Sequence, residues 1–387
     1  MQLFVLKAAT VAAILQTTSA SPMWPRADGI HVISTTTTAD GQVIDWAIPE
    51  SQTGGKIAQP PPVPSHKHGF RSQQAVIRAL FDNNKALQGP NGTVPIPRLS
   101  GTTKSIKRFP TKEDNESFAK IDAASNGYAG KHWYANSGQS VVNYGGEATF
   151  SLFEAFTNKN DFSLIQTAIY HDTPHAGIQT IEAGWINFPG QAALPHLFTY
   201  FTTSGYSKEG DNVGGWNREH KGWVQVDPHI YPGVAFAPLS ARGGIQHEAD
   251  IGYILFAGNW WLWCMGRYIG YYPGAMFAQD GVAAADTLAD HAVGLNFYGE
   301  IFNGEAALTT TDMGSGEWPD TGLGRSAYMH NIVYIDGNNK AQEYNGQAAT
   351  GVSDASRYNL ITNWSSGTKW GSYMYLGGPG AGGKINA

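Results

Sequence analysis

The sequence has almost no cysteine, so it lacks one common means of stabilising an extracellular protein. Cys264 is the only cysteine among 387 residues, and no disulfide can form within the chain. It follows the run Trp260-Trp261-Leu262-Trp263, where we expect a small core side chain rather than a nucleophile. Stability must therefore come from packing, and a hydrophobic content of 42% is enough for a sizeable core.

The standard catalytic motifs are also missing. The sequence has no Gly-x-Ser-x-Gly elbow, no His-Glu-x-x-His pair and no glycine-rich phosphate loop. His171 and His175 are four residues apart, but Pro174 between them is incompatible with a regular helix, so surface-loop histidines are the better interpretation. We expect neither a metal nor a cofactor.

Long apolar runs are confined to the N-terminus. Residues 1–20 are apolar apart from a few polar side chains and end in Thr18-Ser19-Ala20, which is typical of a cleaved signal peptide. The run is too short to span a membrane, and no later stretch is long enough. We predict a secreted, extracellular protein without a membrane anchor, and sequons at Asn91, Asn115 and Asn363 would suit a glycoprotein.

Basic charge is concentrated in one segment near the N-terminus. Residues 65–112 contain nine Lys or Arg and one acid, a net charge of +8, while the whole chain carries −6 and the remainder therefore −14. A basic segment can dock on an acidic remainder, and the acidic balance argues against nucleic acid as a partner. The alternatives are a basic face without a partner, or one that binds an anionic surface.

We interpret residues 21–125 as a removable propeptide that inhibits its own enzyme. The stretch from 21 to about 64 is predicted to be a linker that ends in a proline-rich arm, Gln59–Pro64. Ser72 is placed to cap one short helix that reaches Leu87 and stops at Gly89-Pro90. The dibasic pair Lys107-Arg108 lies near the end of the basic segment.

Residues 126–387 are predicted to form one all-β domain. Glycine is frequent, with 47 residues, and short alternating apolar runs are separated by glycine-rich turns. This pattern favours an antiparallel β-sandwich or barrel over a βαβ fold. The predicted strands cover residues 147–152, 162–170, 178–188, 197–203, 222–226, 251–256 and 297–302.

Two of these strands carry a glutamate among apolar neighbours. Two-residue periodicity puts Glu182 on the face opposite Ile181 and Trp185, and puts Glu300 on the face of Tyr298 and of Asn296 and Phe302. A carboxylate in such a place must be solvated in a cleft, paired or protonated. An edge strand or an outward face, where glutamates are ordinary, is the alternative.

Two carboxylates in one partly apolar cleft can hydrolyse an amide. The first negative charge disfavours the second, so one carboxylate stays ionised while the other keeps a proton. The ionised group takes a proton from the attacking water, and the protonated group stabilises the oxyanion and then protonates the leaving nitrogen. Such a pair works best at acidic pH, and periodicity does not decide which glutamate has which role.

At these residues the sequence resembles the neprosin family of glutamic peptidases, particularly its microbial, fungal members. The similarity extends from about Tyr144 to Asp336 and covers eight motifs in the family's order. They are Phe162-Ser163-Leu164, Thr180-Ile181-Glu182-Ala183-Gly184-Trp185, Leu197-Phe198-Thr199-Tyr200, Gly222-Trp223-Val224-Gln225, Gly258-Asn259-Trp260-Trp261-Leu262, Gly270-Tyr271-Tyr272-Pro273, Gly299-Glu300 and Thr309-Thr310-Thr311-Asp312-Met313-Gly314-Ser315-Gly316.

The resemblance implies an antiparallel β-sandwich, a prolyl-endopeptidase-like activity on peptide or protein substrates, and a propeptide removed in acid. It assigns the two catalytic positions to Glu182 and Glu300. Plant members pair cysteines that this chain lacks, so the loop near residues 210–219 is expected to be shaped differently. Two rivals stay open, a carbohydrate-active sandwich and a non-catalytic glycan-binding sandwich, because twelve tryptophans and two carboxylates would also suit a glycosidase.

Overall fold

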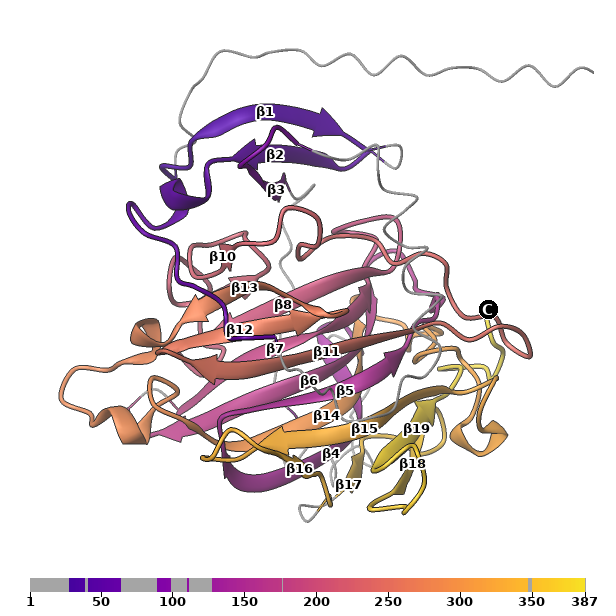
Figure 1. Cartoon of the computed structure of the whole chain (residues 1–387). Coiled ribbons are helices and arrows are strands. Elements are labelled where there is room, and N and C mark those ends of the chain that lie inside the picture. Colours follow the sequence, from indigo (N-terminus) through magenta and orange to yellow (C-terminus); the bar gives the residue numbers. More distant parts are fainter. Residues whose placement is uncertain are drawn as a thin grey trace, which may run out of the picture.

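The computed structural model describes residues 28–38, 41–63, 89–98, 110, 127–175, 177–346 and 350–386. Within these residues the regular structure consists of antiparallel strands and short 3-10 helices, in three sheets (Figure 1). Those helices are η1 (Pro49–Gln52), η4 (Gly274–Phe277), η5 (Ala284–Asp286) and η6 (Pro319–Thr321). No helix of the described residues is long and apolar enough to cross a membrane.

Two large sheets form the body of the molecule. The seven-stranded sheet has the order β17-β4-β14-β6-β7-β8-β9. Its strands are β17 (Thr350–Val352), β4 (Lys131–Asn143), β14 (Ala292–Asn303), β6 (Phe162–Thr173), β7 (Gly177–Asn187), β8 (His196–Thr202) and β9 (Gly214–Trp216).

The nine-stranded sheet has the order β10-β13-β12-β11-β5-β15-β19-β18, with β16 paired to β15. Its strands are β10 (Val224–Gln225), β13 (Arg267–Pro273), β12 (Asn259–Cys264), β11 (Glu248–Phe256), β5 (Gly145–Ser151), β15 (Ala327–Ile335), β19 (Tyr373–Gly377), β18 (Asn359–Asn363) and β16 (Ala341–Glu343).

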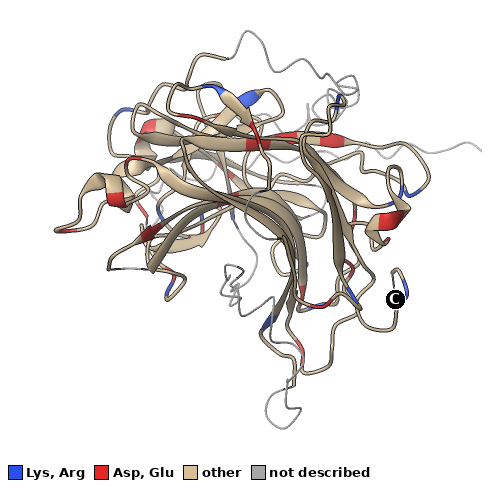
Figure 2. Ribbon diagram, turned by 90° about the horizontal axis from the view of Figure 1, so that it is seen from below, with Lys and Arg blue, Asp and Glu red and all other residues tan. Residues whose placement is uncertain are grey.

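The two large sheets pack face to face as a sandwich, which confirms the predicted fold class. Their facing side chains form one main core, to which β7 contributes Ile181 and Trp185, β14 contributes Phe297, and β12 contributes Trp260 and Cys264. Figure 2 shows the sheets as curved layers. Each predicted strand overlaps an observed one, because alternate apolar side chains must face this core.

Residues 28–63 contain structure that the linker interpretation missed, and that interpretation was wrong. The strands β1 (Val32–Thr37), β2 (Val43–Ala47) and β3 (Val94–Arg98) form a third, three-stranded sheet. Trp46 of this sheet packs against Tyr231 of the sandwich. Alternation in β2 is short, so the strand becomes evident only through its pairing with β3, some 50 residues later.

Several predictions fall outside the described residues. They are the signal peptide, the helix between Ser72 and Leu87, the dibasic pair Lys107-Arg108, the sequon at Asn115 and the propeptide boundary at 125/126. The propeptide assignment itself stays a prediction.

Asp161 explains the threonine-rich motif before Asp312. Its carboxylate is buried and accepts hydrogen bonds from the hydroxyls of Thr309 and Thr311, the latter at 2.7 Å, and from the backbone N–H of Gly304 at 2.7 Å. These bonds fasten the segment after β14 to the loop before β6. The motif therefore has a structural role, since it joins the end of β14 to the start of β6.

Candidate active site

Strands β7 and β14 place Glu182 and Glu300 on the same face of the seven-stranded sheet. Ile181 and Trp185 point into the main core, so Glu182 points to the outer face of this sheet. Phe297 and Ile301 point into the core from β14, which puts Glu300 on the outer face as well. The periodicity argument is confirmed for both strands.

Strand β6 lies between the two glutamate strands and connects them. Glu182 pairs with Ala168, Glu300 pairs with Leu164, and Gln166 is the residue between them on the same face of β6. The side-chain amide of Gln166 donates to Oε2 of Glu182 at 2.7 Å. Gln166 was not predicted as a site residue, although the alternation of β6 places it on this face.

Glu182 is fully buried and surrounded by hydrogen-bond donors. Its Oε1 accepts from the hydroxyls of Thr180 at 2.9 Å and Tyr206 at 2.5 Å, and its Oε2 accepts from Gln166 and from the hydroxyl of Tyr298 at 3.3 Å. Donors of this kind stabilise a buried carboxylate, which would otherwise carry a large desolvation cost. The side chain is therefore held in one orientation.

Tyr206 and Tyr298 link the two glutamates electrostatically. Burial raises the pKa of both phenols well above the usual value, and the charge of Glu300 raises it further in each case. Both hydroxyls therefore keep their protons and remain donors to Glu182. The charge of Glu300 therefore acts on the same two phenols that contact Glu182.

Tyr206 reaches Glu182 from a strained backbone. Its φ is +61°, in the left-handed region that bulky residues rarely adopt. A hydrogen bond from its N–H to the Thr202 hydroxyl at 3.1 Å supports this conformation. Strain of this kind persists only where the surroundings enforce it, and it gathers at functional sites.

Glu300 has a histidine partner that sequence reasoning missed. Nδ1 of His132, on β4, lies 2.7 Å from Oε1 of Glu300, and both side chains are buried. The imidazole is surrounded by the rings of Tyr134, Phe162 and Phe302 at centroid distances of 5.1 to 6.1 Å. The sequence pattern that could have identified His132 is the run Lys131-His132-Trp133-Tyr134. Trp133 packs in the core, so His132, its neighbour in the strand, must face the other way.

An aromatic and apolar cluster surrounds the carboxylates on this face. It consists of Phe162, Leu164, Ile186, Phe188, Phe198, Tyr200, Tyr206 and Trp216. A third acid, Glu209, lies in the loop after β8, where burial raises its pKa to about 7. The site thus combines a low-polarity surface with several acids, the setting in which carboxylate ionisations separate.

Neither glutamate is exposed to solvent, since both have 0% exposure. A cavity of about 660 Å³ lies elsewhere, between residues such as Glu154, Ser240 and Arg242, and its lining includes neither glutamate. A substrate can reach the pair only after part of the chain moves.

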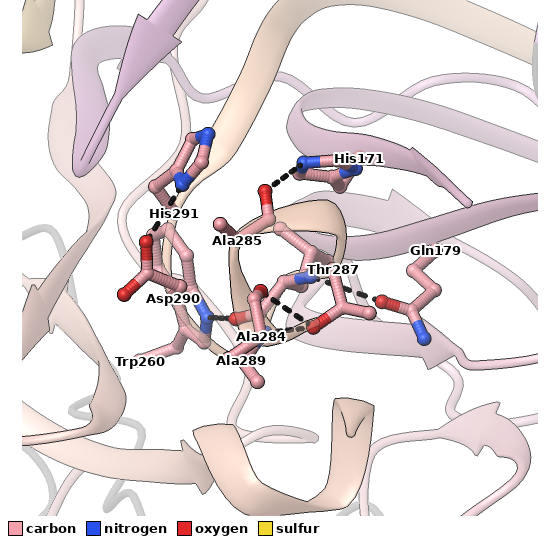
Figure 3. Close-up of polar contacts among 10 residues, drawn as sticks. His171, Gln179, Trp260, Ala284, Ala285, Thr287, Ala289, Asp290 and His291 are labelled. Carbon is pink, nitrogen blue, oxygen red and sulfur yellow. Dashed lines mark hydrogen bonds and ion pairs between the residues drawn. The ribbon is translucent and has the colours of Figure 1, made fainter. Parts of the chain in front are cut away.

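The two histidines considered for metal binding differ in their placement. His175 is exposed in a turn, as expected, whereas His171 lies buried in β6, so its interpretation as a surface-loop histidine was wrong. Nδ1 of His171 lies 2.5 Å from the carbonyl oxygen of Asp172. Its Nε2 lies 3.2 Å from the carbonyl oxygen of Ala285, which is the contact drawn in Figure 3. His171 therefore fastens the η5 loop to β6. The described residues contain no group of three or more His, Cys, Asp or Glu side chains that could hold a metal.

Other residues considered from the sequence are placed as follows. Trp260 and Tyr272 lie in the main core, whereas Trp261 and Tyr271 lie on the outer face of the nine-stranded sheet. Because Trp261 and Tyr271 are also buried, the run is divided between two buried clusters and not between core and surface. The amide of Gln225 donates to backbone carbonyls of its own loop, which confirms ordinary hydrogen bonding there.

Two solved structures resemble the chain at low similarity. One is scytalido-glutamic peptidase with a peptide-based transition-state analogue, at 7% identity and a TM-score of 0.34, and the other is a member of the eqolisin family of peptidases with the tripeptide Ala-Ile-His, at 8% identity and a TM-score of 0.31. Each match covers 64% of this chain and 98% of the solved chain. Similarity at this level carries no argument about the present site.

The family comparison is informative. The neprosin family model matches residues 159–379, which include β7, β14 and every motif from Phe162 onward. Membership supports a peptidase of the glutamic type, as the resemblance implied. Because the match covers more than half of the sequence, this chain belongs to the neprosin family.

Proposed function

We propose that this protein is a secreted acid endopeptidase in which Glu182 and Glu300 activate water. The observation that carries the proposal is the burial of two carboxylates on one face of the seven-stranded sheet, with Gln166 of β6 between them in register and with Tyr206 and Tyr298 donating to Glu182. One carboxylate accepts the proton of the attacking water. The other, protonated, stabilises the oxyanion and then donates to the leaving nitrogen.

The surroundings of the pair support an acidic working range. The phenols of Tyr206 and Tyr298 and the amide of Gln166 are neutral donors at acid and neutral pH. Loss of activity with rising pH then reports deprotonation of the carboxylate that serves as acid. Cleavage after proline follows from the family resemblance, and we propose it as the specificity.

The chain is further proposed to be made as an inactive proform. Both glutamates have 0% exposure, which supports a form whose site opens only when a covering part of the chain moves. The +8 segment at residues 65–112 and the acidic remainder give the segment an electrostatic reason to dock at neutral pH and to loosen as carboxylates become protonated.

A proteome-derived peptide library at acidic pH tests the activity. We expect the wild-type protein to release peptides whose new C-termini are enriched in proline, as read by mass spectrometry, and expect Glu182→Gln and Glu300→Gln each to lower the rate by at least about 100-fold. Glu154→Gln, an exposed glutamate outside the site, is the matched control. Release of reducing sugar that depends on the same glutamates would instead support a glycosidase.

Incubation of the purified full-length protein across a pH series tests the proform. We expect a shorter, active form to accumulate only at acidic pH in the wild type and not in Glu300→Gln. Full activity of the uncleaved chain would contradict latency. The binding of glycans with no cleavage of any substrate would support the non-catalytic rival.

A further inference from the structure

The outer face of the nine-stranded sheet carries a largely buried cluster of aromatic side chains, separate from the two glutamates. We define the aromatic face as Trp261, Trp263, Tyr268 and Tyr271, from β12 and β13. The strand register pairs Trp261 with Tyr271 and Trp263 with Tyr268, with ring centroids 4.6 and 4.8 Å apart. This surface lies on the other large sheet from Glu182 and Glu300 and plays no part in the proposed chemistry.

The chain's own proline-rich arm lies on this face. We define the arm as residues 56–63, which leave the three-stranded sheet and run down over β13 (Figure 1). Ile57 and Ala58 pack against Trp261 and Tyr271. The backbone N–H of Ala58 donates to the Tyr271 hydroxyl at 3.2 Å.

The arm has the periodicity of a polyproline helix. Pro61 is buried, whereas Pro60 and Pro62 on either side are exposed. Ala58, three residues before Pro61, is partly buried and contacts the aromatic face. A polyproline II helix has three residues per turn, so Ala58 and Pro61 lie on the same side of the arm.

Grooves lined by aromatic side chains recognise extended proline-rich peptides for a physical reason. Such peptides are ordered before binding and lose little conformational entropy, and their rings and carbonyl groups meet aromatic faces and hydrogen-bond donors. The indole Nε1 of Trp261 is buried and donates to no described residue, which leaves a donor for a peptide carbonyl.

We propose that the aromatic face is a binding site for extended proline-rich peptides, occupied by residues 56–63 in the full-length chain and free to hold the proline-rich part of a substrate after the N-terminal segment leaves. Only the role of this site in holding a substrate for cleavage rests on the proposed function. Binding itself requires no peptidase activity. The arm competes at a high effective concentration because it is part of the same chain.

A labelled peptide with the sequence of residues 56–63 tests the site by fluorescence anisotropy. The protein carries Glu300→Gln, so that the probe is not cut, and Pro61→Asp, which weakens the docking of the arm at a position outside the core. We expect saturable binding at least about 10-fold tighter than to the Glu300→Gln chain with an intact arm. Tyr271→Phe keeps the ring but removes the acceptor for Ala58, and should weaken binding about fivefold.

Three outcomes would overturn the proposal. The first is the absence of saturable binding to a Glu300→Gln, Pro61→Asp chain whose cooperative thermal transition shows that it is folded. The second is equal binding of a scrambled probe. The third is displacement of the probe by soluble oligosaccharides, which would assign the face to sugars. A second measurement compares acid-processed wild type with Tyr271→Phe. In Tyr271→Phe, the KM for long proline-rich substrates should be higher than in the wild type, and the KM for short substrates should be unchanged.

The two proposals fail separately. Probe binding without any peptide cleavage would retain the binding site and reject the peptidase. Cleavage with no probe binding and no KM difference would retain the peptidase and reject the aromatic face.

Discussion

At the scale of single residues, the site depends on how two buried carboxylates are held. Glu182 is fixed by hydroxyl and amide donors from its own strand, from β6, from β14 and from the loop after β8. Glu300 contacts His132 on β4. The two glutamates therefore have different environments, which is how paired carboxylates acquire different protonation states.

Replacing His132 should impair catalysis without emptying the core. We expect His132→Phe to lower kcat/KM by roughly 10- to 100-fold, because a hydrogen bond to a buried charge contributes about 1.5–3 kcal/mol. His132→Gln, which keeps a side-chain donor, should recover part of the loss, and both should shift the pH profile. The exposed His229→Gln is the control, and an unchanged pH profile in His132→Phe would reject the role.

Removing one hydroxyl should test the link through Tyr206. Tyr206→Phe deletes the donor 2.5 Å from Glu182 Oε1 and keeps the ring that stacks on Tyr200 at 5.9 Å. We expect kcat to fall about 10-fold or more with little change in KM, and the pH profile to move. Kinetics as a function of pH provide the measurement, with Tyr373→Phe on β19 as the control. A change in KM alone would point to substrate packing instead.

At the scale of elements, edge strand β10 is covered by a side chain instead of a strand. The amide of Gln52 donates to the carbonyl of Gln225 at 2.8 Å and accepts from its N–H at 2.9 Å, as a neighbouring strand would. An uncovered edge leaves backbone groups unpaired. This contact also joins the segment of the three-stranded sheet to the sandwich.

Gln52→Ala should therefore loosen the N-terminal segment. Two hydrogen bonds at about 1 kcal/mol each suggest a loss of roughly 1–2 kcal/mol in docking. We expect faster release of the segment from the processed protein, measured by size-exclusion chromatography after acid treatment. The exposed Gln59→Ala is the matched change. Equal release rates would show that apolar contacts such as Trp46 with Tyr231 dominate.

The strand pattern was predictable to the extent that one face of each strand meets a core. In β7 and β14 strict alternation identified both the strands and the direction of Glu182 and Glu300. His132 was missed because a lone histidine before a tryptophan has no motif of its own. Strand β2 was missed because its partner β3 is distant in the sequence, and pairing over that distance leaves no local pattern. Strand β1, which pairs with β2, is mostly Ser and Thr and has no apolar alternation of its own.

At the scale of the whole molecule, buried acids make stability depend on pH. Burial raises the pKa of Glu209 from its ordinary value to about 7, so the folded chain holds a proton there that the unfolded chain has lost. This group's contribution to stability is full at low pH and declines as pH rises toward 7. Burial likewise raises the pKa of Asp312 to about 6, with the same sign.

Glu209→Gln should remove one part of this dependence. Between pH 4 and pH 8 the free energy of unfolding of the variant should rise by about 1 kcal/mol relative to that of its parent. This value is smaller than the full pKa shift implies, because Glu209 is partly exposed to solvent. Thermal unfolding in the Glu300→Gln background, which prevents self-cleavage, measures the difference. A variant with an unchanged slope of Tm against pH would contradict the assignment to Glu209.

The sequence alone determined the all-β class, the strands that carry Glu182 and Glu300, and the face on which each glutamate lies, because a two-residue period and a buried core are local properties. Only the tertiary structure decided which residues meet. The approach of Tyr206 and Gln166 to Glu182, the pairing of His132 with Glu300, and the docking of the proline arm on β12 and β13 join positions far apart in the chain. Such contacts depend on strand order and register, which no stretch of sequence contains by itself.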